Sequence, residues 1–219
     1  MGRYVLREDL SFCHVGGCLV FFDIGSDQYL RLPSTLGAAL VKYLSSESPS
    51  HINVDELVAR NILVEQGDSA PASRPTAIPP TRSSMEEAHP LPRVSFLQAL
   101  EALALVVHTQ MTLKLRPFKH VLRIAGAPAQ TFEAPPLEQQ VIKEAAAFRR
   151  SRLYIPVEMR CLVDSIALAR FLRRRKRNVH VVFGVAVDPF SAHCWVQAGD
   201  LVLNDTLGNV TSHTPIRVA

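Results

Sequence analysis

The hydrophobic and polar positions change their period along the chain, and this change predicts the order of the elements. β-Branched and aromatic residues, which favour strands, are frequent in the first 32 residues. We expect one strand over 4–6 and two more within 18–32, on either side of a Gly-Ser-Asp turn. From Pro33 onward leucines recur at helical spacing, so a helix is expected to begin there.

A capping pattern marks the next helix. Asn53 precedes Glu56 by three residues, the spacing at which two side chains cap a helix reciprocally, and this predicts a helix over 54–59. A turn or short helix over 61–65 is expected to end the module. Residues 1–68 are therefore predicted to form a small three-stranded antiparallel sheet with helices, a marginal size for an independent fold.

The composition changes sharply after Asp68. Six prolines lie among serine, threonine and alanine up to Pro92, a mixture that opposes helices and sheet ladders. Residues 69–92 are therefore expected to be an extended Pro-rich linker between two modules.

Residues 93–219 show helical periodicity first and strand-like runs afterwards. The helices are expected over 96–115, over 137–152 and from about 161 to 175, and the strands over 179–187, 193–199 and 201–205. Helices followed by an antiparallel meander predict an α+β domain.

Composition and charge narrow the class of protein. No uninterrupted apolar run reaches the ~20 residues of a membrane span, and the N-terminus carries charges instead of a signal-peptide core. The four cysteines lack paired spacing, so we expect free thiols, no metal site, no cofactor and a cytoplasmic location without membrane association. The excess positive charge gathers in 149–177, especially Arg170–Arg177, as a docking surface or a solvated helix face.

Cys161 is a candidate nucleophile because it lies at the start of a predicted helix. Amide dipoles at a helix start favour the thiolate, and the same amides can stabilise an oxyanion after the sulfur attacks a carbonyl. A lone cysteine at such a place is also compatible with a small core residue.

A predicted hairpin supplies the partners of this cysteine. If its loop has three residues, His193 faces Asp205, and a carboxylate beside an imidazole orients it as in a catalytic triad. A two-residue loop would instead pair Cys194 with Asp205, and Gly199 is compatible with either loop.

The C-terminal third resembles a known family. The matching strings are CLVDSIALARFL at 161–172, Gly-Val at the end of a strand at 184–185, AHCWV at 192–196 and LND at 203–205. They resemble the transglutaminase-like leader peptidases of lasso-peptide biosynthesis, whose domain is transglutaminase/papain-like. The resemblance implies a Cys161–His193–Asp205 cysteine protease. Cys194 stands where the family usually has alanine.

The N-terminal module resembles the winged-helix-like recognition element of such systems, on the string FFDIGSDQYLRLP at 21–33. In this element a precursor leader peptide adds to the third strand and packs against the third helix. The strand residues carried over are Gln28, Tyr29, Leu30, Arg31 and Leu32. The helix wall carried over is Asp55, Val58, Ala59 and Ile62. Several of these residues are equally compatible with plain hydrophobic core.

The resemblance implies that the chain is a fused B protein of lasso-peptide, and thus antibiotic, biosynthesis. Its partners would be a ribosomal precursor peptide, bound through the leader, and an asparagine-synthetase-like cyclase. Two alternatives stay open: acyl transfer to an amine, as in transglutaminases, and a non-catalytic scaffold that presents the precursor. Nucleic-acid binding is not expected, because residues 1–65 carry more acidic than basic side chains.

Overall fold

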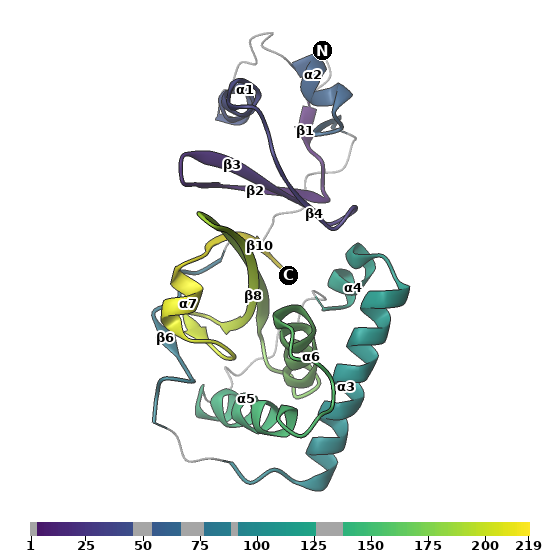
Figure 1. The fold of residues 1–219 in the computed structure, drawn as a ribbon, viewed down its shortest axis with the longest axis vertical. Helices are drawn as coiled ribbons and strands as arrows, with labels where there is room; N and C mark the ends of the chain where they lie inside the picture. Colours follow the sequence, from purple (N-terminus) through teal and green to yellow (C-terminus); the bar gives the residue numbers. More distant parts are fainter. Residues whose placement is uncertain (1–3, 46–53, 67–76, 89–91, 126–137) are drawn as a thin grey trace. The chain divides into compact units, whose positions relative to one another are not determined.

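The computed structural model describes residues 4–45, 54–66, 77–88, 92–125 and 138–219. The chain divides into two compact units, residues 1–74 and 75–219 (Figure 1).

The N-terminal unit contains a three-stranded antiparallel sheet in the order β2-β3-β4. Its described elements are β1 (Tyr4–Leu6), β2 (Leu10–Val15), β3 (Cys18–Asp23), β4 (Gln28–Arg31), α1 (Ser34–Ser45), α2 (Val54–Ala59) and β5 (Leu63–Glu65). The expected strand over 4–6 exists, but it pairs with β5 outside this sheet, and β5 replaces the turn or helix expected over 61–65.

Strand β2 is a second strand of this unit that sequence reasoning missed. It joins β3 through the two-residue turn Gly16-Gly17, whose φ angles of 55° and 72° are those that glycine adopts without steric cost. The core of this unit forms between the sheet and the helices, around Phe21, Leu40 and Leu57.

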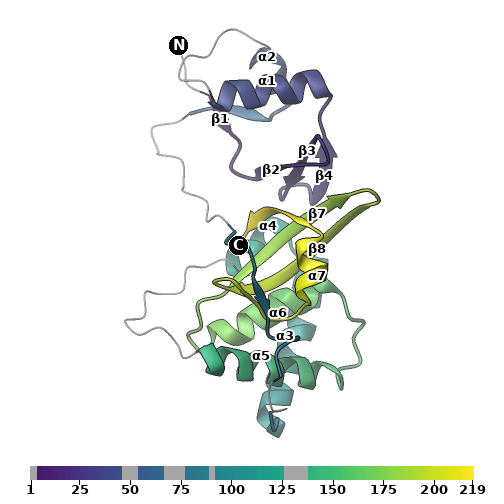
Figure 2. The ribbon, with the colours of Figure 1, turned by 90° about the vertical axis from the view of Figure 1, so that its left-hand side faces the viewer.

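The C-terminal unit is an α+β domain, as predicted. Its described elements are β6 (Arg82–Ser83), α3 (Phe96–Leu115), α4 (Phe118–Ala125), α5 (Glu138–Arg152), α6 (Cys161–Arg173), β7 (His180–Val187), β8 (Phe190–Ala198), β9 (Leu201–Val202), α7 (Leu207–Thr211) and β10 (Thr214–Val218). The sheet order is β10-β7-β8-β9-β6, with β7 and β8 as a long hairpin (Figure 2). Helix α6 packs on β7 and β8, and α3 and α5 pack on α6.

Part of the expected linker belongs to this domain. Residues 77–88 lie in the C-terminal unit, and β6 pairs in parallel with β9. The Thr81 amide donates to the Asp200 carbonyl oxygen at 3.0 Å, and the Ser84 amide donates to that of Val202 at 2.9 Å. Pro79 and Pro80 precede this short pairing, so the proline content does not prevent it.

The basic segment Arg170–Arg177 mostly holds the helices of the domain together. Arg175 and Arg174 pair with Glu101 of α3 at 2.6 and 3.0 Å, and Arg177 pairs with Glu144 of α5 at 2.8 Å. These ion pairs give the positive charge a structural role that neither sequence interpretation included.

Helix α3 is long and apolar enough to cross a membrane by length and composition alone. One face of it is buried through Ala102, Leu105 and Val106 against the domain. The ion pairs of Glu101 tie the same helix to the segment that follows α6. We therefore treat α3 as a structural helix of the C-terminal unit.

Gly184 on β7 permits a close approach that the site depends on. A Cβ atom at this position would lie 2.8 and 2.9 Å from ring carbons of Trp195, which is fully buried, and 3.0 Å from Cβ of His213.

We therefore expect Gly184→Ala to reduce the free energy of unfolding of this unit by about 1–3 kcal/mol, because the indole cannot move aside. Urea denaturation would measure this. Gly208→Ala is the matched control, since nothing lies within 4 Å of its Cβ position; equal stability of the two variants would contradict the argument.

Candidate active site

Cys161 is the first residue of α6, and its side chain is exposed. Its helix is central to the domain, with Ile166, Ala167 and Leu168 fully buried. The N-cap residue Arg160 makes no side-chain hydrogen bond to the first turn among the described residues. The amides at the helix start therefore remain available to a substrate oxygen.

The loop before Cys161 is held by a buried arginine that sequence reasoning missed. Arg152 is 4% exposed, and its guanidinium donates to the carbonyl oxygens of Ile155, Val157 and Glu158 at 3.2, 2.7 and 2.9 Å. The same group pairs with Asp164 of α6 at 2.5 Å. Loss of one partner of a buried ion pair costs ~3–5 kcal/mol, so Arg152 fixes the position from which Cys161 emerges.

The register of the hairpin that carries His193 and leads to Asp205 is that of the shorter loop. Ala198 pairs with Leu201, so the loop has two residues, Gly199 and Asp200. Continuing this register would place Asp205 opposite Cys194 and away from His193. Of the two loops that the sequence allows, the structure has the two-residue one, so the strand register does not place His193 opposite Asp205.

Asp205 nevertheless reaches His193 because the ladder between the strands ends after the Leu203 amide, which still donates to the Val196 carbonyl oxygen at 2.9 Å. The Val196 amide donates to the side-chain Oδ1 of Asn204 at 2.7 Å, so this amide finds its acceptor in a side chain instead of a strand carbonyl. The chain bends over 203–205, and the carboxylate of Asp205 accepts a hydrogen bond from Nε2 of His193. The bend is held from outside by Ser83, whose hydroxyl donates to the Asp205 carbonyl oxygen at 2.5 Å.

A second contact connects this bend to the helix of the cysteine. The side-chain amide of Asn204 donates to Oγ of Ser165 at 2.9 Å, and the Ser165 hydroxyl donates to the Cys194 carbonyl oxygen at 3.0 Å. Ser165 is fully buried in α6. The helix, the strand and the bend are thus fixed to one another close to the candidate triad.

Electrostatics favour an ion pair between the cysteine and the histidine. Hydrogen bonds from the Cys194 thiol and from His193 lower the pKa of Cys161 to about 4. The hydrogen bonds of His193 to Asp205 and to Cys161 raise its pKa to about 9. Burial alone would raise the pKa of Asp205, but bonds from His193, the Thr206 amide and Asn209 lower it. The structure therefore brings Cys161, His193 and Asp205 together as a thiolate, an imidazolium and a carboxylate at neutral pH.

Asn209 completes the surroundings of the carboxylate and was missed from sequence. Its side-chain Nδ2 donates to Oδ2 of Asp205 at 2.9 Å and lies 3.4 Å from Nε2 of His193. It sits on α7, whose N-cap Thr206 accepts from the Asn209 amide N–H. Thr206 and Asn209, three residues apart and directly after Asp205, form the sequence pattern that indicates such a capped turn.

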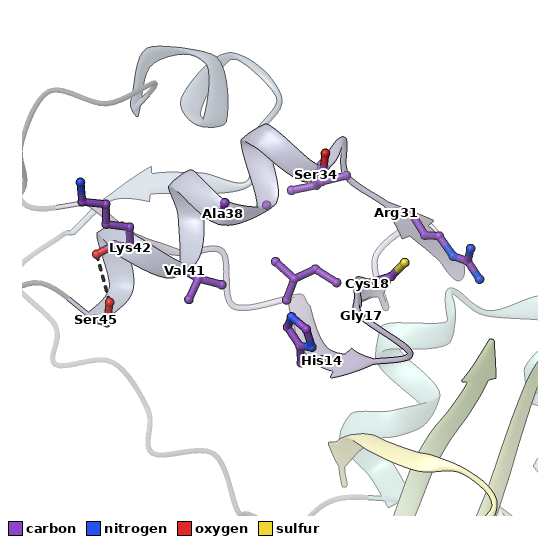
Figure 3. Close-up of a pocket in the computed structure, with 12 residues that line it drawn as sticks. His14, Gly17, Cys18, Arg31, Ser34, Ala38, Val41, Lys42 and Ser45 are labelled. Atoms are coloured by element: carbon purple, nitrogen blue, oxygen red, sulfur yellow. Dashed lines mark hydrogen bonds between the residues drawn. The ribbon is translucent and has the colours of Figure 1, made fainter.

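The N-terminal unit holds a pocket of about 600 Å³ beside the end of β4. Figure 3 shows it between α1, which carries Val41 and Lys42, and the β2–β3 turn next to His14. Arg31 also lines it, and among the described residues that line it none is acidic. The pocket combines an apolar wall with basic side chains, which suits a peptide with apolar and acidic groups.

The predicted leader-binding residues fall in different places. Arg31 and Leu32 line the pocket, while Leu30 packs on the core and Tyr29 stacks on Phe22. Gln28 begins β4, which lies at one side of the described sheet order.

The expected helix wall does not line this pocket. Ile62 is 4% exposed in the core, and Val58 packs on the same core. Asp55 and Ala59 are exposed on α2, whereas the wall of the pocket comes from α1. The predicted wall on α2 and the pocket beside α1 are therefore separate surfaces, and leader binding at Asp55, Val58, Ala59 and Ile62 stays a prediction.

Residues 103–218 match the family model of the transglutaminase-like superfamily. This is more than half of the chain, and the chain therefore belongs to that superfamily. Over 45 residues it is 47% identical to the microcin J25-processing protein McjB of Escherichia coli. That match covers 20% of this chain and 22% of the relative, so the matched segment spans about a fifth of McjB. No solved structure gives a significant match.

The ion pair predicts an unusual pH profile for the alkylation of Cys161. Because its pKa is lowered to about 4, the thiolate persists as the pH falls and is lost only near that value. We expect the iodoacetamide rate at Cys161, followed by peptide mass spectrometry, to change less than about threefold between pH ~5.5 and ~8. A free thiol with a pKa of about 8.5 loses about tenfold per pH unit in this range. His193→Ala should make the profile steeper, because it removes one of the hydrogen bonds that lower the pKa of Cys161 while those of Cys194 remain. A steep profile in the wild type would contradict the ion pair.

Proposed function

We propose that the chain is a cytoplasmic leader peptidase of lasso-peptide maturation. The observation that carries the proposal is the set of hydrogen bonds joining Cys161 to His193 and His193 to Asp205. Membership of the transglutaminase-like superfamily and the partial similarity to a microcin-processing protein support the class of substrate.

Cleavage would proceed through an acyl-enzyme. The Cys161 thiolate attacks the carbonyl carbon of the bond between leader and core, and the amides at the start of α6 stabilise the oxyanion. The His193 imidazolium protonates the amine of the core, which leaves. Water, deprotonated by His193, then hydrolyses the thioester and releases the leader as a free acid.

The pKa values define the protonation of the resting site. In a cysteine protease whose resting thiol is neutral, the histidine takes the thiol proton during the attack. With the pKa of Cys161 near 4 and that of His193 near 9, the proton has already moved in the resting site. The role of Asp205 is then to hold the imidazolium toward the departing amine and to stabilise its charge.

The N-terminal unit is proposed to hold the leader. The pocket beside β4 would take apolar and acidic side chains, while the backbone of Gln28–Leu32 would pair with the leader strand. Tethering would raise the local concentration of the scissile segment near Cys161, to the order of mM for short flexible linkers. The amine freed by cleavage would then be joined to an Asp or Glu side chain of the core by an asparagine-synthetase-like partner cyclase.

Substitution of the triad tests the catalytic part. We expect Cys161→Ala to abolish cleavage of a lasso precursor peptide between leader and core, and Asp205→Asn to lower the rate by a factor on the order of 10⁴. Mass spectrometry of the products measures both, and it also separates hydrolysis from acyl transfer to an added amine. Cys13→Ala, at a cysteine of the other unit that does not line the pocket, is the control. Comparable cleavage by a folded Cys161→Ala variant would overturn the assignment.

Leader binding has its own test on α1. Val41 lines the pocket, whereas Leu44 is equally exposed on the same helix but does not. Val41→Glu should weaken the binding of a synthetic leader peptide at least about tenfold, since it places an acid in a basic pocket. Leu44→Glu should have little effect, and so should Ala59→Glu on α2. Isothermal titration to the full chain measures all three; a loss confined to Ala59→Glu would favour the α2 wall instead.

A further inference from the structure

A second thiol lies beside the candidate nucleophile. Cys194 follows His193 on β8 and is 3% exposed, whereas Cys161 is exposed at the start of α6. The two thiol groups are hydrogen-bonded to each other, and the Cys194 amide also donates to the sulfur of Cys161. The proposed cleavage uses neither sulfur–sulfur bonding nor the reactivity of Cys194.

The two sulfurs are held together by rigid elements. Ser165, one turn into α6, donates to the Cys194 carbonyl oxygen, and Asn204 donates to Ser165. The backbone of β8 at Cys194 is paired with Phe183 of β7. Neither cysteine belongs to a loop, so their proximity follows from the packing of the helix on the sheet.

We propose that Cys161 and Cys194 form a reversible disulfide when the protein meets a peroxide, and that this bond switches the site off. Redox-sensing cysteines are accessible thiolates placed next to a resolving cysteine. Here Cys161 is the accessible member and Cys194 the buried, resolving one.

The chemistry needs one peroxide for each disulfide. The Cys161 thiolate attacks a peroxide oxygen, so that an S–O bond forms, the O–O bond breaks and hydroxide leaves. The sulfur of Cys194 then attacks the sulfenic sulfur, forming the S–S bond and expelling water with the proton of Cys194. Two thiols lose two electrons, which reduce hydrogen peroxide to water. A dithiol reductant returns both thiols by exchange.

The disulfide would also protect the site. Without a nearby thiol, a sulfenic acid is oxidised further to sulfinic acid, which dithiols do not reduce. A bond to Cys194 removes the sulfenic acid before that step. The inference rests on the proposed function for its loss of activity, but not for the formation of the bond.

The test uses the full reduced chain and hydrogen peroxide. We expect the intact mass to fall by two hydrogen atoms, and a non-reduced digest to contain a cross-linked peptide joining Cys161 to Cys194. Precursor cleavage should fall at least about tenfold and recover with dithiothreitol. Cys13→Ala should behave like the wild type, because its thiol lies in the other unit and outside the pocket.

Two variants of the resolving cysteine complete the test. Cys194→Ser keeps a hydrogen-bonding group and Cys194→Ala removes it, and each is compared with its own untreated activity. Both should gain oxygen at Cys161 and fail to recover fully with dithiothreitol. Oxygen addition without the cross-link in the wild type would overturn the inference, and so would a cross-link that joins Cys161 to Cys18 or Cys13. A cross-link in a chain that cleaves no precursor would overturn the proposed function and leave the disulfide standing.

Discussion

The hydrogen bond between His193 and Asp205 joins a long strand of the sheet to a bend that no longer belongs to it. His193 lies within β8, whose position is set by pairing with β7 on one side. Asp205 depends on the early end of β9, and this end depends on Asn204 supplying the acceptor for the Val196 amide. A buried amide without an acceptor would destabilise the fold by ~1–3 kcal/mol. The side chain of Asn204 supplies the acceptor, so the chain can bend here without that loss. Residues 82–84 then support the bend from outside.

Cys161 is positioned by a different set of contacts from those that position His193 and Asp205. The two sets of contacts meet at Ser165. Helix α6 is buried along most of its length, so the direction of its first turn is fixed by packing. Arg152 fixes the loop that leads into this turn, and its charge is balanced by Asp164. A charge this deeply placed is stable only with its partner, and removing either group would release the loop and the helix start together. The geometry of the site is therefore a property of the whole domain.

Much of this fold follows from periodicity in the sequence, because one face of each long helix or strand is buried. The helix over 96–115 has the bounds that its pattern predicts, and the three catalytic candidates meet. The Gly16-Gly17 pair is a standard hairpin signal in the sequence, and it marks the turn that joins β2 to β3. By contrast, β6 and β10 are short strands. The partner of β6 is β9, far away in the sequence, and the pairing of β10 with β7 contains a register shift. No local pattern specifies such contacts.

The hairpin shows how a correct pair of residues can rest on an incorrect register. The sequence around Gly199 is compatible with two loop lengths, and the choice between them depends on which side chains meet the core. The two-residue loop places Trp195 and Val202 in the core, and Trp195 then requires the missing Cβ of Gly184. The contact between His193 and Asp205 is recovered afterwards by the bend. A contact inferred from residue type and order can therefore form without the strand pairing that was assumed for it. The side chain of Asn204 redirects the chain, and the alternation of side chains along a strand carries no information about such a bend.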